Sequence, residues 1–335
     1  MNKAKKIDGN ILRLIIIFVV IFLIATVTKG SGFLNAGNLQ TMARALTEYG
    51  LMAVGCGIAM MSGGIDLSTV YVANLVAIIA GKMMAEAGIG ILPSVLCGLL
   101  VGIVCGAFNG FLISKLNIPA MLATLGSYQL YMGIAIVISN GSTVSLSVGA
   151  ADRGTPKGDM LNSFNAFASK TVCGIPVPFL VFIAVVIVMS LLLSYTKFGK
   201  RVHLVGTNAR ASRFAGINNV SVLIRAYMLS GLVSAIAGII SLSRLRSAKA
   251  DFGSSYTMQT ILISVLGGVN PNGGFGNIPG IFIAVLILQM LSSYLTLFPS
   301  VSNYYRDMIW GIALIGVLIL NHYVEQRRTR KLAQK

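Results

Sequence analysis

Few residues of this chain could take part in chemistry. The sequence of 335 residues contains nine acidic residues, two histidines and four cysteines. His203 and His322 lie far apart, and the cysteines show no metal-ligand spacing, so we expect no metal site and no cofactor. The sequence has no phosphate-binding loop motif of the Walker A type, and no catalytic triad or carboxylate pair stands out. We therefore expect the chain not to be an enzyme and not to use ATP itself.

Asp66 differs from the other acidic residues because it lies among apolar and small residues, between Met61 and Leu67. An ionisable group beside membrane-spanning segments is costly unless it is hydrated or paired, so such a residue often marks a solute path. Asp66 or Ser68 could equally cap the next helix, because the Gly63-Gly64 pair before them favours a helix break. Both interpretations remain open, and they are compatible.

Two further features involve pairs of residues. Gly267-Gly268 ends an apolar run and leads into a Gly- and Asn-rich segment, residues 270–276. Interrupted hydrophobic segments in both halves of a transporter point to its working region.

Arg44 and Glu48 have the i, i+4 spacing of a helical ion pair, so we expect them to pair at the end of a span.

The elements that must position these residues are membrane helices. The chain is 56% hydrophobic and 10% charged, whereas a soluble domain has roughly 25% charged residues. We expect an all-α, polytopic transmembrane bundle, a single permease domain over residues 1–335, with an uncleaved first span. The expected ten or so spans are residues 11–28, 45–62, 67–86, 90–114, 119–138, 177–196, 220–243, 257–269, 277–298 and 304–322. Residues 257–269 are too few to cross a bilayer of about 30 Å, so they predict a broken or re-entrant helix.

The net charge of +17 is distributed in short Lys/Arg clusters between apolar blocks. This pattern is typical of topology signals and does not favour a nucleic-acid partner. The clusters lie in the N-terminal segment, in the loop at 197–213 and in the C-terminal tail. By the positive-inside rule we expect both termini and this loop in the cytoplasm of a bacterial inner-membrane protein, and the 139–176 loop outside.

A stripe of small residues lies within one expected span, where Gly98, Gly102, Gly106 and Gly110 recur every four residues. Such a stripe lets another helix backbone approach closely. It predicts a tight interface, within the subunit or between two subunits, although membrane helices also tolerate small residues generally.

Short motifs occur in order from about residue 45 to the end of the chain. They are Ser62-Gly63-Gly64-Ile65-Asp66-Leu67-Ser68, Ile118-Pro119-Ala120 with Ala123-Thr124-Leu125-Gly126, Phe198-Gly199-Lys200, residues 206–217, Ser243-Arg244-Leu245 with Ser247-Ala248, Gly267-Gly268 and Gly273-Gly274-Phe275-Gly276. Together they resemble the permease subunits of ABC importers for monosaccharides of the ribose, xylose and galactose type. The first motif contains that family's Gly-Ile-Asp-Leu-Ser signature.

The chain departs from the family pattern at three places near the expected path. Thr69-Val70 stands where the family usually has Val-Gly, Thr207 replaces the second Gly of Gly-Gly-Asn, and Thr257-Met258-Gln259 stands where many members have Glu-Leu-Asp. The resemblance therefore indicates the class of transporter and not the exact sugar.

The resemblance implies a transport subunit that forms the path for a monosaccharide or a similar small polar solute. It implies as partners a second permease copy or paralogue, a cytoplasmic ABC ATPase and an extracytoplasmic solute-binding protein, in contact with membrane lipid. The candidate path residues are Gly63, Gly64, Asp66, Ser68, Thr124, Gly267 and Gly268. The candidate ATPase-coupling residues, in a loop at about 197–219, are Gly206, Thr207, Asn208, Ala209, Arg210, Ala211, Arg213 and Gly216. The same basic loop could instead serve only to set topology.

Two other functions stay open from the residues alone. One is an ion- or proton-coupled transporter that uses Asp66 as its coupling carboxylate, although such a protein would normally carry more ionisable groups within its spans. The other is a membrane scaffold that transports nothing. A requirement of solute uptake for a co-purifying ATPase distinguishes the importer from both.

Overall fold

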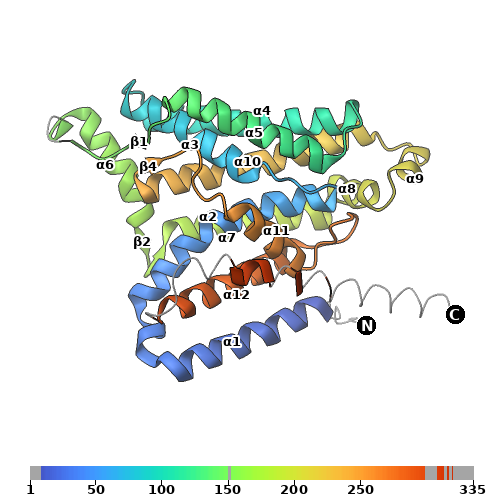
Figure 1. The fold of residues 1–335 in the computed structure, drawn as a ribbon, viewed down its shortest axis with the longest axis horizontal. Helices are drawn as coiled ribbons and strands as arrows, with labels where there is room; N and C mark the ends of the chain where they lie inside the picture. The colour runs from blue at the N-terminus through green and yellow to red at the C-terminus, as the bar shows by residue number, and fades with distance from the viewer. Residues whose placement is uncertain (1–8, 150–151, 299–307, 313–314, 317–318, 320–335) are drawn as a thin grey trace.

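The computed structural model describes residues 9–149, 152–298, 308–312, 315–316 and 319. The described chain is mostly helical (Figure 1), because a helix satisfies its own backbone hydrogen bonds in lipid. The longer helices are α1 (Gly9–Leu34), α2 (Ala36–Met61), α3 (Thr69–Ala85), α4 (Ile91–Lys115), α5 (Ala120–Ser139), α7 (Val177–Tyr195), α10 (Asn219–Leu245) and α12 (Ile278–Thr296). The shorter helices are α6 (Pro156–Ser169), α8 (Lys197–Thr207), α9 (Ala209–Phe214) and α11 (Tyr256–Leu266).

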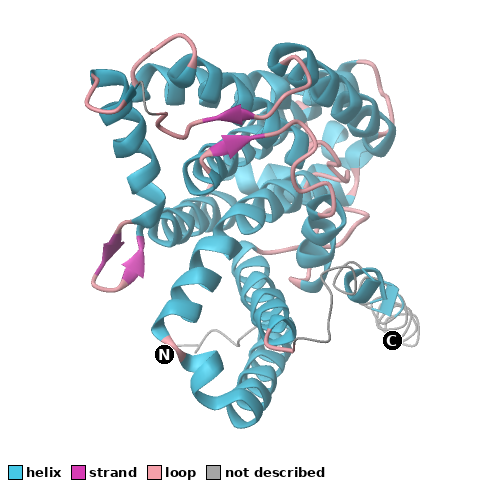
Figure 2. Cartoon of the chain, turned by 60° about the vertical axis from the view of Figure 1, so that its left-hand side comes forward, coloured by secondary structure: helices cyan, strands magenta, loops and turns pink. Residues whose placement is uncertain are grey.

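The bundle has two different ends. At one end, which we call the sheet end, lie α6 and two antiparallel strand pairs: β1 (Val144–Ser145) with β4 (Ser247–Ala248), and β2 (Thr171–Val172) with β3 (Ile175–Pro176) (Figure 2). At the other end, which we call the basic end, lie α8, α9 and the first turn of α1 (Figure 1). The 139–176 segment, expected as a loop, therefore contains a helix and short strands at the sheet end.

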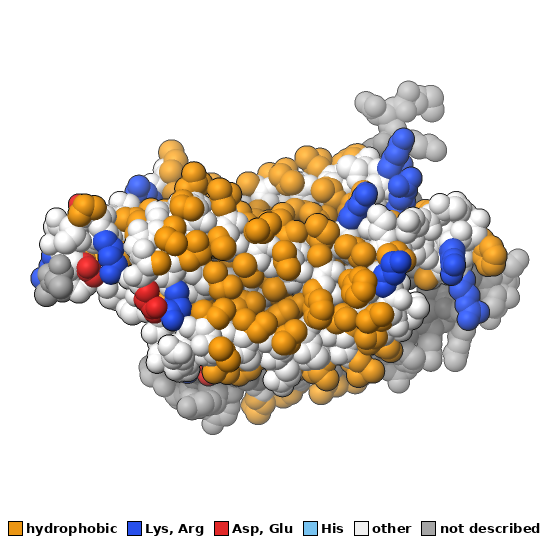
Figure 3. Space-filling model, turned by 90° about the horizontal axis from the view of Figure 1, so that it is seen from above, with side chains coloured by type: hydrophobic (Ala, Val, Ile, Leu, Met, Phe, Trp, Pro, Cys, Tyr) orange, Lys and Arg blue, Asp and Glu red, His pale blue; other side chains and the backbone are white. Residues whose placement is uncertain are grey.

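The surface has an apolar band between these two ends. On the face that carries α4 and α5, hydrophobic side chains fill the middle, and Lys and Arg side chains lie at both ends (Figure 3). Acidic side chains on this face appear only toward the sheet end (Figure 3). Exposed leucines such as Leu92, Leu96 and Leu100 follow one side of α4, which is the pattern of a helix that faces hydrocarbon.

The central helix of the bundle is α2, which is buried almost continuously from Leu46 to Met61. Three of its glycines each face a different neighbour. A Cβ on Gly50 would lie 2.9 Å from the Phe182 ring of α7, one on Gly55 would lie 3.0 Å from the Ser230 carbonyl of α10, and one on Gly57 would lie 2.3 Å from Ile281 of α12. Small residues thus let three helices surround α2, as is typical of packing inside membranes.

The glycine stripe of α4 forms an interface within the subunit. A Cβ on Gly102 would lie 2.6 Å from the Gly231 carbonyl oxygen of α10, and one on Gly106 would lie 2.1 Å from the Tyr227 carbonyl oxygen. Gly110 approaches Ile224 in the same way, while Gly98 faces Val76 of α3. The packing interpretation of the stripe is therefore confirmed, with α10 as the main partner.

The expected spans before residue 300 all fall on described helices. Six of those helices are long and apolar enough to cross a membrane: α1, α4, α5, α7, α10 and α12. α2 is long but less apolar, α3 and α11 are shorter, and the expected span at 304–322 lies mostly outside the described residues, so the count of ten is not confirmed. Lys3, Lys5 and Lys6 of the N-terminal segment and the basic residues of the C-terminal tail lie outside the described part, whereas Arg13 lies in α1.

The expectation that residues 257–269 are too few to cross the bilayer is confirmed by α11. This helix has 11 residues, which is about 16 Å at 1.5 Å per residue and half of the bilayer core. It starts at Tyr256, after β4, most of its residues from Gln259 to Val265 are buried, and residues 267–277 then lead into α12.

Candidate functional site

The turn between α2 and α3 holds Asp66 inside the bundle. Gly63, with φ 104°, turns the chain after α2, and the Asp66 side chain is only 3% exposed. Its Oδ1 accepts hydrogen bonds from the Ser68 backbone N–H at 2.9 Å and from the Ser68 hydroxyl at 2.6 Å. Its Oδ2 accepts from the Ser230 hydroxyl of α10 at 3.0 Å. Asp66 therefore stabilises an Asx-type turn before α3 and ties that turn to α10.

The expectation that Asp66 or Ser68 caps α3 through a side-chain hydrogen bond is not met. Ser68 occupies the N-cap position of α3, but its side chain makes no capping bond. Asp66, two residues earlier, bonds the Ser68 backbone N–H instead. The carboxylate thus orders the approach to the helix and does not bond the N–H groups of its first turn.

A chain of polar side chains continues from this turn into α4 and α5. The Asn109 amide donates to the Ser68 hydroxyl at 2.8 Å, and the Tyr131 hydroxyl lies 3.0 Å from Asn109 Oδ1. Asn109, Tyr131 and Ser230 are each buried. They were not among the residues expected from the sequence, because isolated polar residues within apolar spans carry no local signal of a shared cluster. We call Asp66, Ser68, Asn109, Tyr131 and Ser230 the polar cluster.

Two other expected path residues lie against the same turn. The Thr124 hydroxyl of α5 lies 3.1 Å from the Ile65 carbonyl oxygen. A Cβ on Gly64 would lie 2.3 Å from the Ala120 Cβ and 2.7 Å from the Tyr227 hydroxyl. That hydroxyl is buried and has no hydrogen-bond partner among the described residues. The structure thus brings Gly63, Gly64, Asp66, Ser68 and Thr124 together.

The structure places Gly267 and Gly268 elsewhere, at the junction of α11 and α12. A Cβ on Gly267 would lie 2.7 Å from the Ile281 backbone nitrogen, and Gly268 has φ 89° beside the Asn10 side chain of α1. Asn10 donates to the Gly267 carbonyl at 3.3 Å. The close packing of α1, α11 and α12 explains why glycine stands at both positions.

The expected coupling residues form an ordered projection at the basic end, which we call the coupling segment (residues 206–217). Asn208 caps α9 by accepting from the Ala211 backbone N–H at 2.9 Å. Asn219 donates to the Ala209 carbonyl at 2.7 Å, which closes the segment at its other end. Its outer surface exposes Ala209, Arg210, Ala211 and Arg213. Phe214 is 94% exposed.

Four glycines join this segment to the Asp66 turn, and we call Gly63, Gly206, Gly273 and Gly274 the glycine junction. A Cβ on Gly206 would lie 2.1 Å from the Met61 carbonyl oxygen and 2.6 Å from the Gly274 nitrogen. A Cβ on Gly273 would lie 2.5 Å from the Gly63 Cα. The Gly274 backbone N–H donates to the Met61 carbonyl at 3.0 Å. Three segments far apart in sequence therefore touch backbone to backbone.

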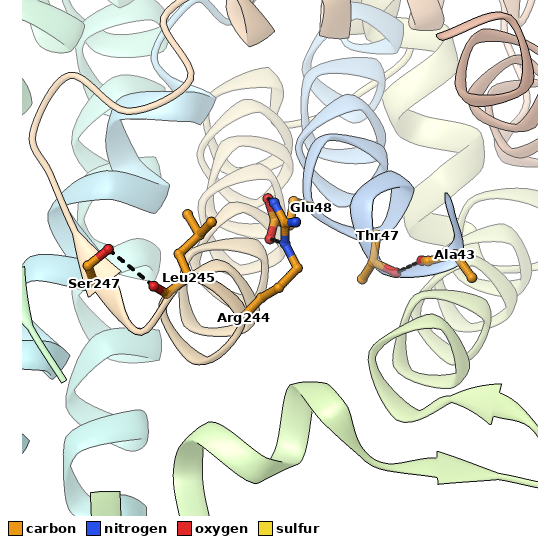
Figure 4. A network of polar contacts seen from close by, with 6 residues as sticks. All are labelled: Ala43, Thr47, Glu48, Arg244, Leu245 and Ser247. Atoms are coloured by element: carbon orange, nitrogen blue, oxygen red, sulfur yellow. Dashed lines mark hydrogen bonds and ion pairs between the residues drawn. The ribbon is translucent and has the colours of Figure 1, made fainter. Parts of the chain in front are cut away.

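Glu48 has a different partner from the one expected. Its carboxylate is fully buried and receives two hydrogen bonds from the Arg244 guanidinium of α10, one of them at 2.9 Å (Figure 4). Arg44 instead donates to the Ser169 carbonyl at 3.1 Å. The expected Arg44–Glu48 pair is wrong, because the buried carboxylate needs a partner that is also inside the bundle.

The architecture defines a class of protein: a multi-pass membrane transport subunit with a buried polar cluster and a basic projection on one side. The sequence matches the family described as "Branched-chain amino acid transport system / permease component" over residues 38–318. The chain belongs to this family of permease components. It is a transport subunit of an ABC importer, and the ATPase is a separate subunit.

Relatives support this assignment over most of the chain. The chain is 32% identical to the ribose import permease of Bacillus subtilis over 306 residues, 91% of this chain and 90% of that protein. It is 32% identical to the ribose import permease of Escherichia coli K12 over 311 residues, 92% of both chains. It is also 32% identical to an autoinducer 2 import permease of Yersinia enterocolitica over 305 residues, 90% of this chain and 80% of that protein.

A solved structure shares the fold. It is that of an ABC transporter in an inward-facing conformation, with a TM-score of 0.54 and 16% sequence identity, over 93% of this chain and 98% of that chain. At this identity the similarity concerns the fold alone.

Proposed function

We propose that this permease imports a monosaccharide or a similar small polar solute across a bacterial inner membrane, and that its coupling segment receives the ATPase. The names of the ribose and autoinducer 2 import permeases support this solute class. The partners are then a second permease copy or paralogue, a cytoplasmic ABC ATPase and an extracytoplasmic solute-binding protein. The whole chain acts as one permease domain.

The observation that carries the proposal is the glycine junction. The exposed face of the coupling segment offers small residues, two arginines and the exposed Phe214, a surface suited to docking, since exposed aromatics and Arg are enriched at interfaces. Behind this face, Gly206 contacts the end of α2 and the segment before α12 without any intervening side chain. A displacement of the coupling segment is thereby transmitted to the turn that holds Asp66, because packed backbones have no slack to absorb it.

The polar cluster supports the same proposal and disfavours ion coupling. Both Asp66 oxygens accept hydrogen bonds from serines of this chain, so the carboxylate is occupied in holding α3 against α10. A coupling carboxylate would need access to water, whereas Asp66 is 3% exposed. Asp66, Ser68 and Thr124 then act on the path by positioning its helices, and the path itself lies where these helices meet the second permease.

Charge supports the orientation. Five Lys and Arg residues lie within residues 197–213 at the basic end: Lys197, Lys200, Arg201, Arg210 and Arg213. By the positive-inside rule the basic end faces the cytoplasm, where an ATPase is available. The start of α1 lies at this end (Figure 1), which supports a cytoplasmic N-terminus.

The test is transport by vesicles that contain this permease, its ATPase and its binding protein, with radiolabelled ribose as the first probe. We expect Ala211→Glu to abolish uptake and to release the ATPase during purification, because a charged side chain is placed on the docking face. Ala87→Glu makes the same change at an exposed alanine of the sheet end and should keep the ATPase bound. Full uptake with Ala211→Glu would show that the ATPase docks elsewhere.

A further inference from the structure

A groove at the basic end lies between α4 and α10, away from the polar cluster. Its outer part is a cavity of about 440 Å³ whose polar lining residues are Lys115, Asn218, Ser221 and Arg225. A second cavity of about 330 Å³ shares Arg225 with the first, and Met228 also lines both. The two cavities therefore form one continuous groove that is polar at one end and apolar at the other.

The polar part carries two cations whose charge is not balanced. Lys115 and Arg225 are both exposed, and neither takes part in an ion pair of the described chain. Among the described residues, no acidic side chain lines either cavity. The groove therefore favours an anion at this position.

The apolar part runs from the basic end into the hydrocarbon band. Its lining includes Ile103 of α4 and Leu232 of α10. Leu232 lies two turns beyond Arg225, which is about 10 Å along the helix axis. A soluble anion would fill only the polar part, whereas a molecule with an anionic head and an acyl chain matches both parts.

We propose that this groove binds an anionic glycerophospholipid from the leaflet at the basic end. Its phosphate lies between Lys115 and Arg225, within reach of the polar groups of Asn218 and Ser221, and one acyl chain lies along Ile103 and Leu232. Basic pockets between membrane helices on the cytoplasmic side suit lipid headgroups of this charge. The inference needs the chain to lie in a membrane and does not depend on the proposed solute or on ATPase docking.

The first experiment uses the full-length wild-type protein, purified from vesicles of equal parts phosphatidylglycerol, phosphatidylethanolamine and phosphatidylcholine. Native mass spectrometry counts the lipids that remain through stepwise detergent washing. We expect phosphatidylglycerol to be retained well after phosphatidylcholine is lost. We also expect it to stay bound when inorganic phosphate is added at about 50-fold molar excess over the lipid, since a ligand competes in proportion to its concentration relative to its dissociation constant. Equal loss of both lipids, or displacement by phosphate, would overturn the proposal.

The second experiment distinguishes binding of the lipid headgroup from binding of its acyl chain. We expect Lys115→Gln and Arg225→Gln each to lower phosphatidylglycerol retention about fivefold, the effect of one cation near a charged headgroup. Ile103→Trp fills the apolar part, leaves both cations in place and should also release the lipid. Arg13→Gln removes an exposed cation at the basic end outside the groove and should leave retention unchanged. If Ile103→Trp still retains phosphatidylglycerol, the groove binds only the phosphate. If Arg13→Gln loses as much phosphatidylglycerol as Lys115→Gln and Arg225→Gln, general surface charge holds the lipid. Either result contradicts a lipid groove.

Discussion

Asp66 illustrates how a carboxylate can be kept inside a membrane bundle. Each of its oxygens accepts from a serine, and Ser68 passes the connection on to Asn109 of α4. Buried networks of this kind are stable only when each member is satisfied. The polar cluster therefore joins the turn before α3 to three other helices, and its loss should affect folding before it affects transport.

We expect Asp66→Asn to fold and Asp66→Leu to be clearly destabilised. The Asn side chain keeps one acceptor for Ser68, and the Ser230 hydroxyl can accept from its amide group. Leu leaves the Ser68 and Ser230 groups without partners, at about 1–3 kcal/mol for each buried polar group. Melting in detergent, followed by size-exclusion chromatography, measures the difference. If Asp66→Asn folds but transports nothing, the negative charge itself is required.

The Glu48–Arg244 pair permits a second test. Glu48 is fully buried, so Glu48→Leu alone leaves the Arg244 guanidinium without its partner. Removing one member of a buried ion pair costs about 3–5 kcal/mol, whereas replacing both with apolar residues is often tolerated. We therefore expect the double variant Glu48→Leu, Arg244→Met to melt at a higher temperature than Glu48→Leu. If the loss of stability in the double variant equals the sum of the losses in the two single variants, Glu48 and Arg244 act independently.

These partners could not be read from the sequence. Glu48 and Arg244 are 196 positions apart, and Arg44 offered a local partner at ideal helical spacing. Local spacing finds pairs on a helix surface, but Glu48 faces the inside of the bundle. Asp66 could be found because an acidic residue among apolar and small residues is a local signal, and so is the break at Gly63 and Gly64.

At the scale of the helices, glycine determines which faces meet. The contact of α4 with α10 depends on Gly102, Gly106 and Gly110, each of which would place a Cβ within 2.6 Å of α10. Because the backbones themselves are in contact, the neighbouring helix must move as a whole to admit a side chain.

We expect Gly106→Leu to damage folding far more than Gly126→Leu. A Cβ on Gly106 would meet the Tyr227 carbonyl at 2.1 Å, whereas Gly126 of α5 has no atom within 4 Å of its Cβ position among the described residues. Overpacking costs about 1–3 kcal/mol even where side chains can adjust. Expression level and the midpoint of thermal aggregation measure the effect, and equal values for the two variants would remove glycine packing as the cause.

Helices that face lipid were predicted well, and those inside the bundle less well. For α4, α5 and α7 the apolar run ends near the lipid boundary, and the expected spans agree with the structure to within a residue or two. α2 begins at Ala36 and not near residue 45, because its first turns are polar and lie at the sheet end. α6 is not predicted from the sequence because its residues form no long apolar run.

At the scale of the whole molecule, labelling of a native cysteine shows which end of the protein faces the outside of the cell. Cys173 is exposed and lies between β2 and β3 at the sheet end, while Cys56 and Cys105 are buried. We expect a membrane-impermeant maleimide to label intact cells at Cys173, and Cys173→Ser to abolish this labelling. Ala209→Cys in the Cys173→Ser background should react only after the cells are permeabilised. Labelling of Ala209→Cys in intact cells would place the basic end outside.

The burial of α2 has a consequence for how the protein is made. The helices that surround α2 are α7, α10 and α12, and they are synthesised long after it. A helix with a buried Glu48 and many small residues partitions poorly into lipid by itself. During synthesis α2 therefore precedes each of these packing partners, and Glu48 has no guanidinium partner until Arg244 of α10 is made. A chain that ends before residue 244 therefore carries an α2 whose Glu48 carboxylate lacks the partner that it has in the complete fold.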